Sequence, residues 1–176
     1  MRIIETEKSS NASEMVCSDE YWMRLALDAA VAAASVGEVP VGAIAVSPSG
    51  HLLASAHNLT ITQSDPTAHA EVLALRAASA LAGNYRLTGS TLYTTVEPCV
   101  MCAGALLNAR IARLVFGTHD ERFGAVESQF RLCDSAVLNH RIEVVSGVMA
   151  SESRALIQNF FSRRRTEIRS KRQTRR

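Results

Sequence analysis

Four residues whose side chains suit metal and proton chemistry fall into two short segments of the chain. His69 and Glu71 lie in the first segment, and Cys99 and Cys102 lie in the second. If the second segment begins a helix, residues three apart lie on one side of it, and both thiolates face the same point. An imidazole and two thiolates suit zinc in tetrahedral geometry, and the two thiolates balance the charge of the ion. We therefore predict one Zn²⁺ ion per subunit, bound by His69, Cys99 and Cys102.

The number of ligands favours a catalytic zinc ion over a structural one. Three protein ligands leave the fourth position for water, whose pKa zinc lowers toward neutrality. A hydrolytic reaction then needs a group that moves protons, and we predict that Glu71 is this catalytic residue. The alternative is a structural zinc site, which needs a fourth protein ligand. None of the other two cysteines and four histidines has a ligand-type spacing to the three.

Both segments are expected at the starts of helices. The sequence Asp65-Pro66-Thr67 is typical of a helix start, and Pro98 is typical of another. Positions 69 and 71 do not share a helix face, so the metal should lie off the N-terminal end of the helix, where both side chains can reach it. A helix N-terminus also lowers the pKa of a cysteine and favours the thiolate that binds metal.

Hydrophobic patterns and turn residues predict the elements that hold these segments. A first hairpin, followed by strands that alternate with helices, predicts an α/β fold. We expect a three-layer α/β/α sandwich around a five-stranded mixed sheet. The predicted helices cover residues 21–36, 65–82, 99–108 and 130–138, and a last helix is predicted after a cap at Ser151. The predicted strands cover residues 41–46, 52–56, 91–96, 111–116 and 142–148.

Length and composition are typical of one globular domain. The chain has 176 residues, of which 47% are hydrophobic and 20% charged. No apolar run approaches the ~20 residues that span a bilayer, and the N-terminal residues lack the apolar centre of a signal peptide. We expect a cytoplasmic location without a membrane partner. The four cysteines should be reduced there.

The charges of the chain are distributed unevenly. Residues 163–176 contain eight Arg or Lys against one acid, Glu167, which gives this end a net charge of +7. Because the whole chain carries +2, the remainder carries −5. A basic end on an acidic body suggests an anionic partner, and nucleic acid is the leading candidate. The alternative is a solvated tail that aids solubility.

The two segments together form a specific pattern. His-x-Glu is followed, 28 residues after the glutamate, by Cys-x-x-Cys with proline before the first cysteine. This pattern resembles the signature of the cytidine-deaminase-like zinc deaminases, which act on nucleobases. Further segments resemble the bacterial tRNA-specific adenosine deaminases within that group. They are Glu-Tyr-Trp-Met-Arg at 20–24, Glu-Val-Pro-Val-Gly-Ala at 38–43, Asp-Pro-Thr-Ala-His-Ala-Glu at 65–71, Asn-Tyr-Arg-Leu at 84–87, Glu-Pro-Cys-Val-Met-Cys-Ala-Gly-Ala at 97–105, and Phe160-Phe161.

The resemblance covers residues 18–168 and implies a deaminase domain there, between a flexible N-terminal extension over 1–17 and a basic tail over 169–176. It implies a cytidine-deaminase-like fold and a homodimer. It also implies that adenosine at the wobble position of a tRNA anticodon stem-loop is converted to inosine. The family's substrate contacts, matched residue by residue, fall on Asn58, Pro40, Val41, Asp120, Phe160 and Phe161. One departure is Glu127, where the family usually has glycine.

Several alternatives remain open on the sequence. The same fold and zinc chemistry can deaminate a free nucleobase or nucleoside, such as cytosine, cytidine or guanine. A non-catalytic RNA-binding module with a structural zinc ion is another possibility, although such a site has no use for Glu71. Among the substrate contacts, Asn58 can serve a turn, Asp120 can cap a loop, and the two phenylalanines can belong to the core.

Overall fold

The computed structural model describes residues 17–173. The predicted N-terminal extension over 1–17 lies outside the described residues except for Cys17. Residues 174–176 of the predicted basic tail also lie outside them. Within the described range, no helix is long and apolar enough to cross a membrane.

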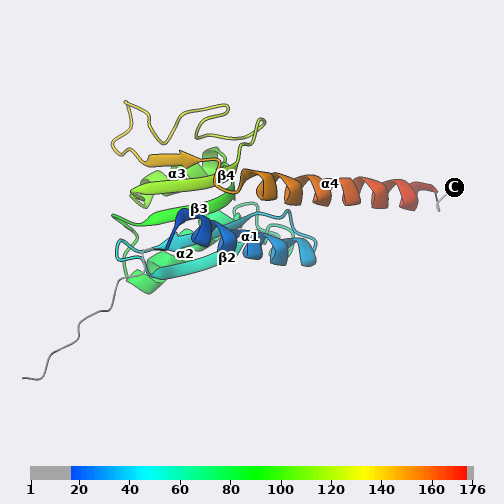
Figure 1. Ribbon diagram of the computed structural model, residues 1–176, viewed down its shortest axis with the longest axis horizontal. Coiled ribbons are helices and arrows are strands. Elements are labelled where there is room, and N and C mark those ends of the chain that lie inside the picture. The colour runs from blue at the N-terminus through cyan, green and yellow to red at the C-terminus, as the bar shows by residue number, and fades with distance from the viewer. Residues whose placement is uncertain (1–16, 174–176) are drawn as a thin grey trace, which may run out of the picture.

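A five-stranded mixed sheet runs through the middle of the molecule (Figure 1). Its strands are β1 (Gly42–Val46), β2 (Leu52–His57), β3 (Thr91–Val96), β4 (Arg113–Thr118) and β5 (Glu143–Ser146). Their order is β2-β1-β3-β4-β5, with β1 antiparallel to both of its neighbours and with β3, β4 and β5 parallel. The carboxyl ends of the three parallel strands therefore share one edge, and the loops that follow them meet there.

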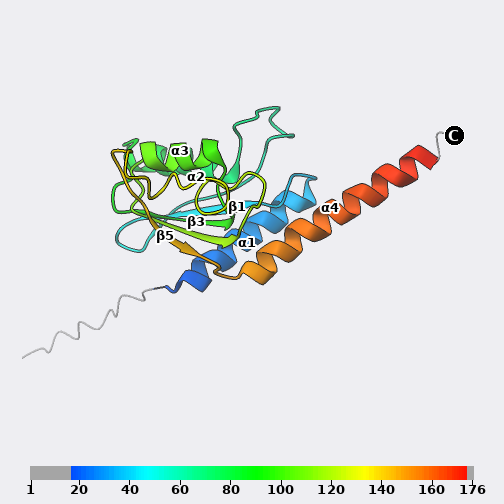
Figure 2. The same cartoon turned by 90° about the horizontal axis from the view of Figure 1, so that it is seen from above.

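Helices cover both faces of this sheet, so the predicted three-layer α/β/α sandwich is confirmed (Figure 2). They are α1 (Asp19–Ser35), α2 (Ala70–Ala82), α3 (Val100–Asn108) and α4 (Ala150–Gln173). The helices α2 and α3 pack together on one face, and α1 and α4 pack together on the other.

Strand β1 contributes to the core on both faces of the sheet. Ala43 and Ala45 belong to the core on the α2 and α3 side, whereas Ile44 belongs to the core under α1, because successive side chains of a strand point to opposite faces. The approach of α1 is so close that a Cβ atom on Gly42 would lie 2.0 Å from the carbonyl oxygen of Ala26. Glycine is therefore required where the chain enters β1.

All four helices begin at residues other than predicted, and the starts of α2 and α4 change what the neighbouring residues do. Asp65 Oδ1 accepts hydrogen bonds from the N–H and hydroxyl groups of Thr67 and closes a turn, so α2 begins only at Ala70. The last helix begins at Ala150, which overturns Ser151 as its cap. It continues through Gln173, and the predicted tail is therefore helical over residues 169–173.

The predicted short helix over residues 130–138 is wrong. Residues 119–142 form turns and one isolated bridge instead. Backbone groups of this segment bond across it: the N–H of Leu132 donates to the carbonyl of Ala125, and the N–H of Ile142 donates to that of Cys133. These bonds replace the i to i−4 pattern of a helix. The flanking strands shift as well, to 113–118 from the predicted 111–116 and to 143–146 from 142–148.

Candidate metal centre and active site

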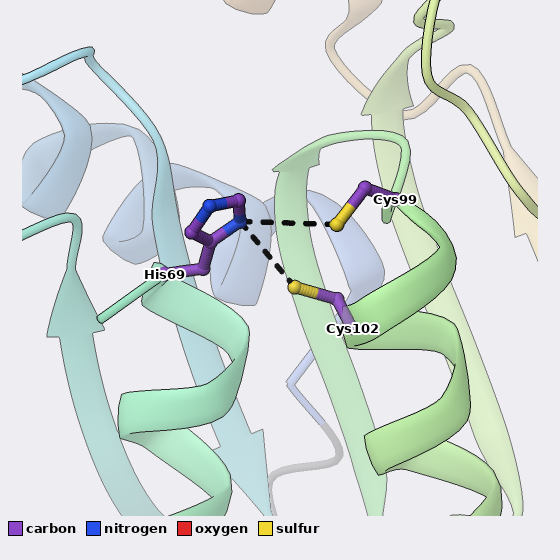
Figure 3. Close-up of side chains that lie close together, drawn as sticks. All are labelled: His69, Cys99 and Cys102. Atoms are coloured by element: carbon purple, nitrogen blue, oxygen red, sulfur yellow. Dashed lines mark hydrogen bonds between the residues drawn. The ribbon is translucent and has the colours of Figure 1, made fainter. Parts of the chain in front are cut away.

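The predicted ligand segments meet at the N-terminal ends of two neighbouring helices (Figure 3). His69 is the N-cap residue of α2, and Cys99 is the N-cap residue of α3. Neither side chain makes a capping hydrogen bond with its own helix. Because α2 and α3 pack side by side, their ends bring His69 to Cys99 and Cys102. This is the place expected from the spacing of positions 69 and 71.

The three side chains have the spacing of a tetrahedral zinc site. His69 Nδ1 lies 3.6 Å from Cys102 Sγ and 3.9 Å from Cys99 Sγ, and all three donor atoms lie within 4.8 Å of one another. Zinc bonds of about 2.0–2.1 Å to nitrogen and about 2.3 Å to sulfur place the two ligand atoms about 3.6 Å apart. A single Nδ1–H group can point at only one of the two sulfurs, whereas one ion binds all three atoms. These residues therefore fit zinc.

The two thiols have unequal acidity. The pKa of Cys99 is lowered to about 4, mainly by its hydrogen bond with Cys102 and further by His69. The pKa of Cys102 is raised by the same hydrogen bond and by its burial. Metal binding requires both sulfur atoms as thiolates, and two thiolates balance the charge of a divalent cation.

Glu71 lies in the first turn of α2 and is only 4% exposed. Its Oε2 atom is buried and, among the described residues, has no hydrogen-bond partner. Burial raises the pKa of this carboxyl group. An unpaired buried carboxylate oxygen lowers the stability of a fold, so its presence beside three metal-binding side chains points to a role in the reaction.

Asn58, Pro40 and Val41 lie together beside the turn that carries His69. The N–H of Asn58 donates to the Val41 carbonyl at 3.1 Å, and Asn58 Oδ1 accepts from the N–H of Ala70 at 2.9 Å. The oxygen of Asn58 therefore serves the N-terminus of α2, which leaves the two amide N–H groups available as donors. Pro40 is buried and Val41 is half-buried, so the two residues form an apolar wall next to it.

Asp120 lies in the irregular segment after β4, where its side chain serves its own turn. Its Oδ1 atom accepts from the N–H groups of Arg122 and Phe123 at 3.0 and 3.2 Å. Its backbone N–H donates to Glu97 Oε2 at 3.1 Å. The loop-capping role left open by the sequence is thus present, and Glu97 links Asp120 to the turn that carries Cys99.

Phe160 and Phe161 have different surroundings on α4. Their rings meet edge to face, with centroids 5.4 Å apart and planes at 79°. Phe160 is 6% exposed and belongs to the core, whereas Phe161 is 42% exposed. Of the two rings, only that of Phe161 is exposed at the surface.

Sequence reasoning did not point to two buried glutamates beside the site. Glu38 is fully buried and accepts from the hydroxyl of Thr60 and from the N–H groups of Ile61 and Thr62. Glu97 is 3% exposed and accepts from the segment after β4. Both stand next to a proline motif in an apolar stretch. Because acidic residues are almost never buried without partners, this setting is the signal that could have found them.

Comparison with known proteins identifies the family. A family model described as the cytidine and deoxycytidylate deaminase zinc-binding region matches residues 16–118, which include all three ligands and Glu71. The chain belongs to this deaminase family. Zinc, predicted from the donor set, is thereby confirmed as the cofactor of the deaminase domain.

Relatives of this deaminase carry names that concern tRNA. A tRNA-specific adenosine deaminase of Haemophilus influenzae is 50% identical over 149 residues, which are 85% of this chain and 86% of that protein. A structure from a study of A-to-I editing by tRNA:A34 deaminases at the wobble position of transfer RNA matches with a TM-score of 0.74 and 43% identity, over 77% of this chain and 97% of that chain. The cytidine-deaminase-like fold and the resemblance to tRNA-specific adenosine deaminases are confirmed.

The fold also occurs in a deaminase of a free base. A guanine deaminase from Nitrosomonas europaea matches with a TM-score of 0.69 and 26% identity, over 82% of this chain and 85% of that chain. Fold and zinc site alone therefore do not decide the substrate.

Proposed function

We propose that this deaminase converts adenosine to inosine at the wobble position of a tRNA anticodon. The observation that carries the proposal is the cluster of His69, Cys99 and Cys102 beside the buried, unpartnered oxygen of Glu71. A structural zinc site has no use for such a carboxylate, which disfavours a non-catalytic RNA-binding module. The names of the relatives support the substrate class.

Glu71 moves the protons of the reaction. When bound by the three ligands, a zinc ion supplies Lewis acidity and makes water nucleophilic at neutral pH. Glu71 takes the protons of the attacking water in turn, and delivers one to N1 of adenine and one to the amino nitrogen on C6. A C6–O bond forms, the C6–N bond breaks, and ammonia leaves. The raised pKa of Glu71 suits a group that accepts and returns protons near neutral pH.

The base reaches this site only after it has left the stack of the anticodon loop. Pro40 and Val41 contact the extruded base as an apolar wall, and the amide nitrogen of Asn58 donates to the nucleoside. The Asn58 oxygen bonds to the N-terminus of α2, so the same residue ties the base contact to the helix that carries Glu71.

Helix α4 supplies a basic arm for the RNA backbone. The turn that carries Cys99 follows β3 and α4 follows β5, and these parallel strands end at the same edge of the sheet. From that edge α4 runs for 24 residues, about 36 Å, and projects beyond the body (Figures 1 and 2). Residues 161–170 are all exposed, with arginines at 163, 164, 165 and 169. These arginines and Phe161, backed by Phe160, contact the RNA together with Asp120 at the same edge. A free nucleoside needs no such surface.

The deaminase domain spans residues 18–168 and works in the cytoplasm as a homodimer, as the resemblance implies. Light scattering on the purified protein tests the assembly. A homodimer has twice the mass of one chain, and a mass of one chain contradicts it.

Guanine deamination is the second candidate, because a guanine deaminase shares the fold. The exposed arginines of α4 argue for a macromolecular substrate instead. A guanine deaminase turns over a free base, which has no phosphate, whereas a tRNA deaminase is expected to need the RNA.

Inosine formation decides between them. The protein is mixed with an anticodon stem-loop that carries adenosine at the wobble position, and in parallel with free adenosine, cytidine, cytosine and guanine. We expect inosine in the RNA and no turnover of the free compounds. Turnover of a free compound with unchanged RNA would keep the zinc chemistry and overturn the tRNA substrate.

A further inference from the structure

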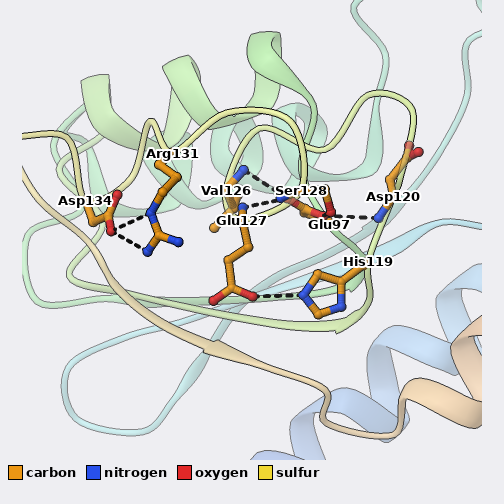
Figure 4. A network of polar contacts seen from close by, with 8 residues as sticks. All are labelled: Glu97, His119, Asp120, Val126, Glu127, Ser128, Arg131 and Asp134. Atoms are coloured by element: carbon orange, nitrogen blue, oxygen red, sulfur yellow. Dashed lines mark hydrogen bonds and ion pairs between the residues drawn. The ribbon is translucent and has the colours of Figure 1, made fainter.

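The loop after β4 is held by a carboxylate from another part of the chain. We call residues 120–128 the 120–128 loop. Glu97, on the turn between β3 and α3, accepts five hydrogen bonds from this loop (Figure 4). Its Oε1 atom accepts from the N–H groups of Val126, Glu127 and Ser128 at 3.0, 2.7 and 2.9 Å, and its Oε2 atom accepts from the N–H of Asp120 at 3.1 Å and from the hydroxyl of Ser128.

We infer that Glu97 is a positioning residue for the reaction: its carboxylate fixes the 120–128 loop to the turn that carries Cys99 and so places the loop for RNA. This inference rests on the proposed function, which assigns an RNA contact to Asp120. It assigns to Glu97 no contact with the substrate or the metal.

The donors fill the capacity of the carboxylate. A carboxylate offers about four lone-pair sites, and Glu97 already accepts five hydrogen bonds. It is also 3% exposed. Such a group is neither open to a proton from the substrate nor free to bind a metal. The remaining role of Glu97 is to fix the positions of the groups that donate hydrogen bonds to it.

The turn and the loop are in direct contact beyond this carboxylate. The N–H of Ala125 donates to the carbonyl of Pro98 at 2.8 Å, and Cys99 forms an isolated bridge with Gly124. A Cβ atom on Gly124 would lie 2.3 Å from Glu97 Oε2. The backbone of the loop therefore lies against the segment that carries a metal ligand, and a displacement of the loop changes its distance to the site.

The tip of the loop has little packing of its own to hold it. Residues 121–123 are exposed, and Phe123 is among the exposed large side chains. Within the loop, Asp120 closes a turn, Glu127 shares a hydrogen bond of 2.9 Å with His119, and Ala125 and Val126 are buried in the core. Hydrogen bonds to a charged acceptor are stronger than such contacts at the surface. Glu97 thus supplies the largest set of polar contacts that hold the loop.

Replacement of Glu97 by glutamine tests this role. Glutamine keeps the size of the side chain, but its NH₂ group cannot accept the hydrogen bonds that one oxygen now accepts. We expect faster hydrogen exchange at the N–H groups of the loop, unchanged exchange at the N–H of Thr62, which Glu38 holds, and one zinc ion per chain as before. The value of kcat/KM for the stem-loop should fall about ten- to hundredfold, mainly through KM, because small misplacements have such effects. Glu143→Gln, the same change at an exposed glutamate, is the control and should match the wild type.

Three results would overturn the inference. Unchanged exchange in the loop would show that Glu97 does not hold it. Faster exchange with unchanged kcat/KM would show that its position does not matter to the reaction. Loss of zinc would show that Glu97 acts through the metal site. The exchange measurement needs no activity, so a wild type that forms no inosine contradicts the proposed function separately.

A milder variant serves if Glu97→Gln does not fold. Ser128→Ala removes only the hydroxyl donor to Glu97 and keeps the four backbone donors. We expect faster exchange in the loop and a few-fold rise in KM. No change in either quantity would contradict the role of Glu97.

Discussion

The N-terminal ends of α2 and α3 each have a buried glutamate beside the metal ligands, and the two have opposite surroundings. Glu71 has an oxygen without a partner among the described residues, and burial raises its pKa. Glu97 accepts five hydrogen bonds; burial alone would raise its pKa, but the donors outweigh burial and hold it below the ordinary value. Nearness to the metal ligands therefore does not determine the role of a carboxylate. The hydrogen-bond donors around the carboxylate determine it.

This difference distinguishes a carboxylate that takes part in the reaction from one that stabilises the structure around the site. A fold gains stability when every buried polar group is paired, and gives up some of it where a reactive group is left unpaired. Glu38 agrees with this rule, because it is fully buried and has three donors from residues 60–62. Glu71, which has an unpaired oxygen, thus differs from Glu38 and Glu97, which each hold a loop.

The largest effect is expected from loss of a metal ligand. Cys102→Ala removes a ligand and should abolish zinc binding and inosine formation, which metal analysis and the stem-loop assay measure. Cys133→Ala is the matched control, because Cys133 is an equally buried thiol of the core away from the metal cluster. It should lose about 1 kcal/mol of stability and keep zinc and activity. Retained zinc in Cys102→Ala would contradict the ligand set.

A smaller effect is expected where the loop meets Glu97. A Cβ atom on Gly124 would lie 2.3 Å from Glu97 Oε2 and 2.6 Å from the Asp120 carbonyl oxygen. Gly124→Ala should therefore lower the free energy of unfolding by about 1–3 kcal/mol and raise KM for the stem-loop, with zinc retained. Gly104→Ala in α3, where a Cβ atom meets nothing within 4 Å, is the control and should be neutral or stabilising. Equal behaviour of the two variants would argue against close contact between turn and loop.

Glu38 extends the comparison between paired and unpaired glutamates, because its contribution to the free energy of unfolding should depend on pH. Burial alone would raise its pKa, but the donors from Thr62, Ile61 and Thr60 together hold it below the ordinary value. Its charge therefore stabilises the fold above the ordinary glutamate pKa of about 4.3, and this contribution is lost as the pH falls toward the lower pKa of the folded state. Glu38→Gln should lower the free energy of unfolding by about 1–3 kcal/mol at pH 7. Urea unfolding from pH 7 to pH 4 should show this gap narrowing as the pH falls, and a constant gap would contradict a stabilised charge.

The smallest effect on stability is expected at Glu71. Glu71→Gln keeps the shape of the side chain and removes a buried charge with an unpaired oxygen, so the free energy of unfolding should stay within about 1 kcal/mol of the wild type or rise. Glu97→Gln should lose more. Urea unfolding of both variants loaded with zinc makes the comparison, and a greater loss in Glu71→Gln would reverse the roles of the two residues.

The sequence predicted those features that depend on neighbours along the chain. Cys99 and Cys102 lie within one helical turn, and Pro98 indicated the start of α3, whereas Pro66 lies in a turn before α2. The order of the strands and of α1 to α4 was predictable for the same reason, but the predicted helix over 130–138 does not form. The two segments were joined into one site by their resemblance to a known pattern.

Features that depend on distant donors were not predictable. Glu97 bonds to residues 23 to 31 positions away, and no local pattern announces such partners. Other bonds across the segment, from Leu132 to Ala125 and from Ile142 to Cys133, decide the course of residues 130–142, where the sequence predicted a helix over 130–138. The hydrogen bond of Asn58 to the N-terminus of α2 depends on Ala70, twelve positions later. Local propensity yields to tertiary hydrogen bonds in each case.

The most direct test compares wild type, Glu71→Gln and Glu97→Gln, each with one zinc ion, at saturating concentrations of the anticodon stem-loop. We expect inosine at the wobble position from the wild type, a rate lower by about 10² to 10⁴ in Glu71→Gln because the proton carrier is missing, and a rate closer to the wild type in Glu97→Gln. A rate in Glu71→Gln equal to that of the wild type would contradict the assignment of the unpaired carboxylate to the chemistry.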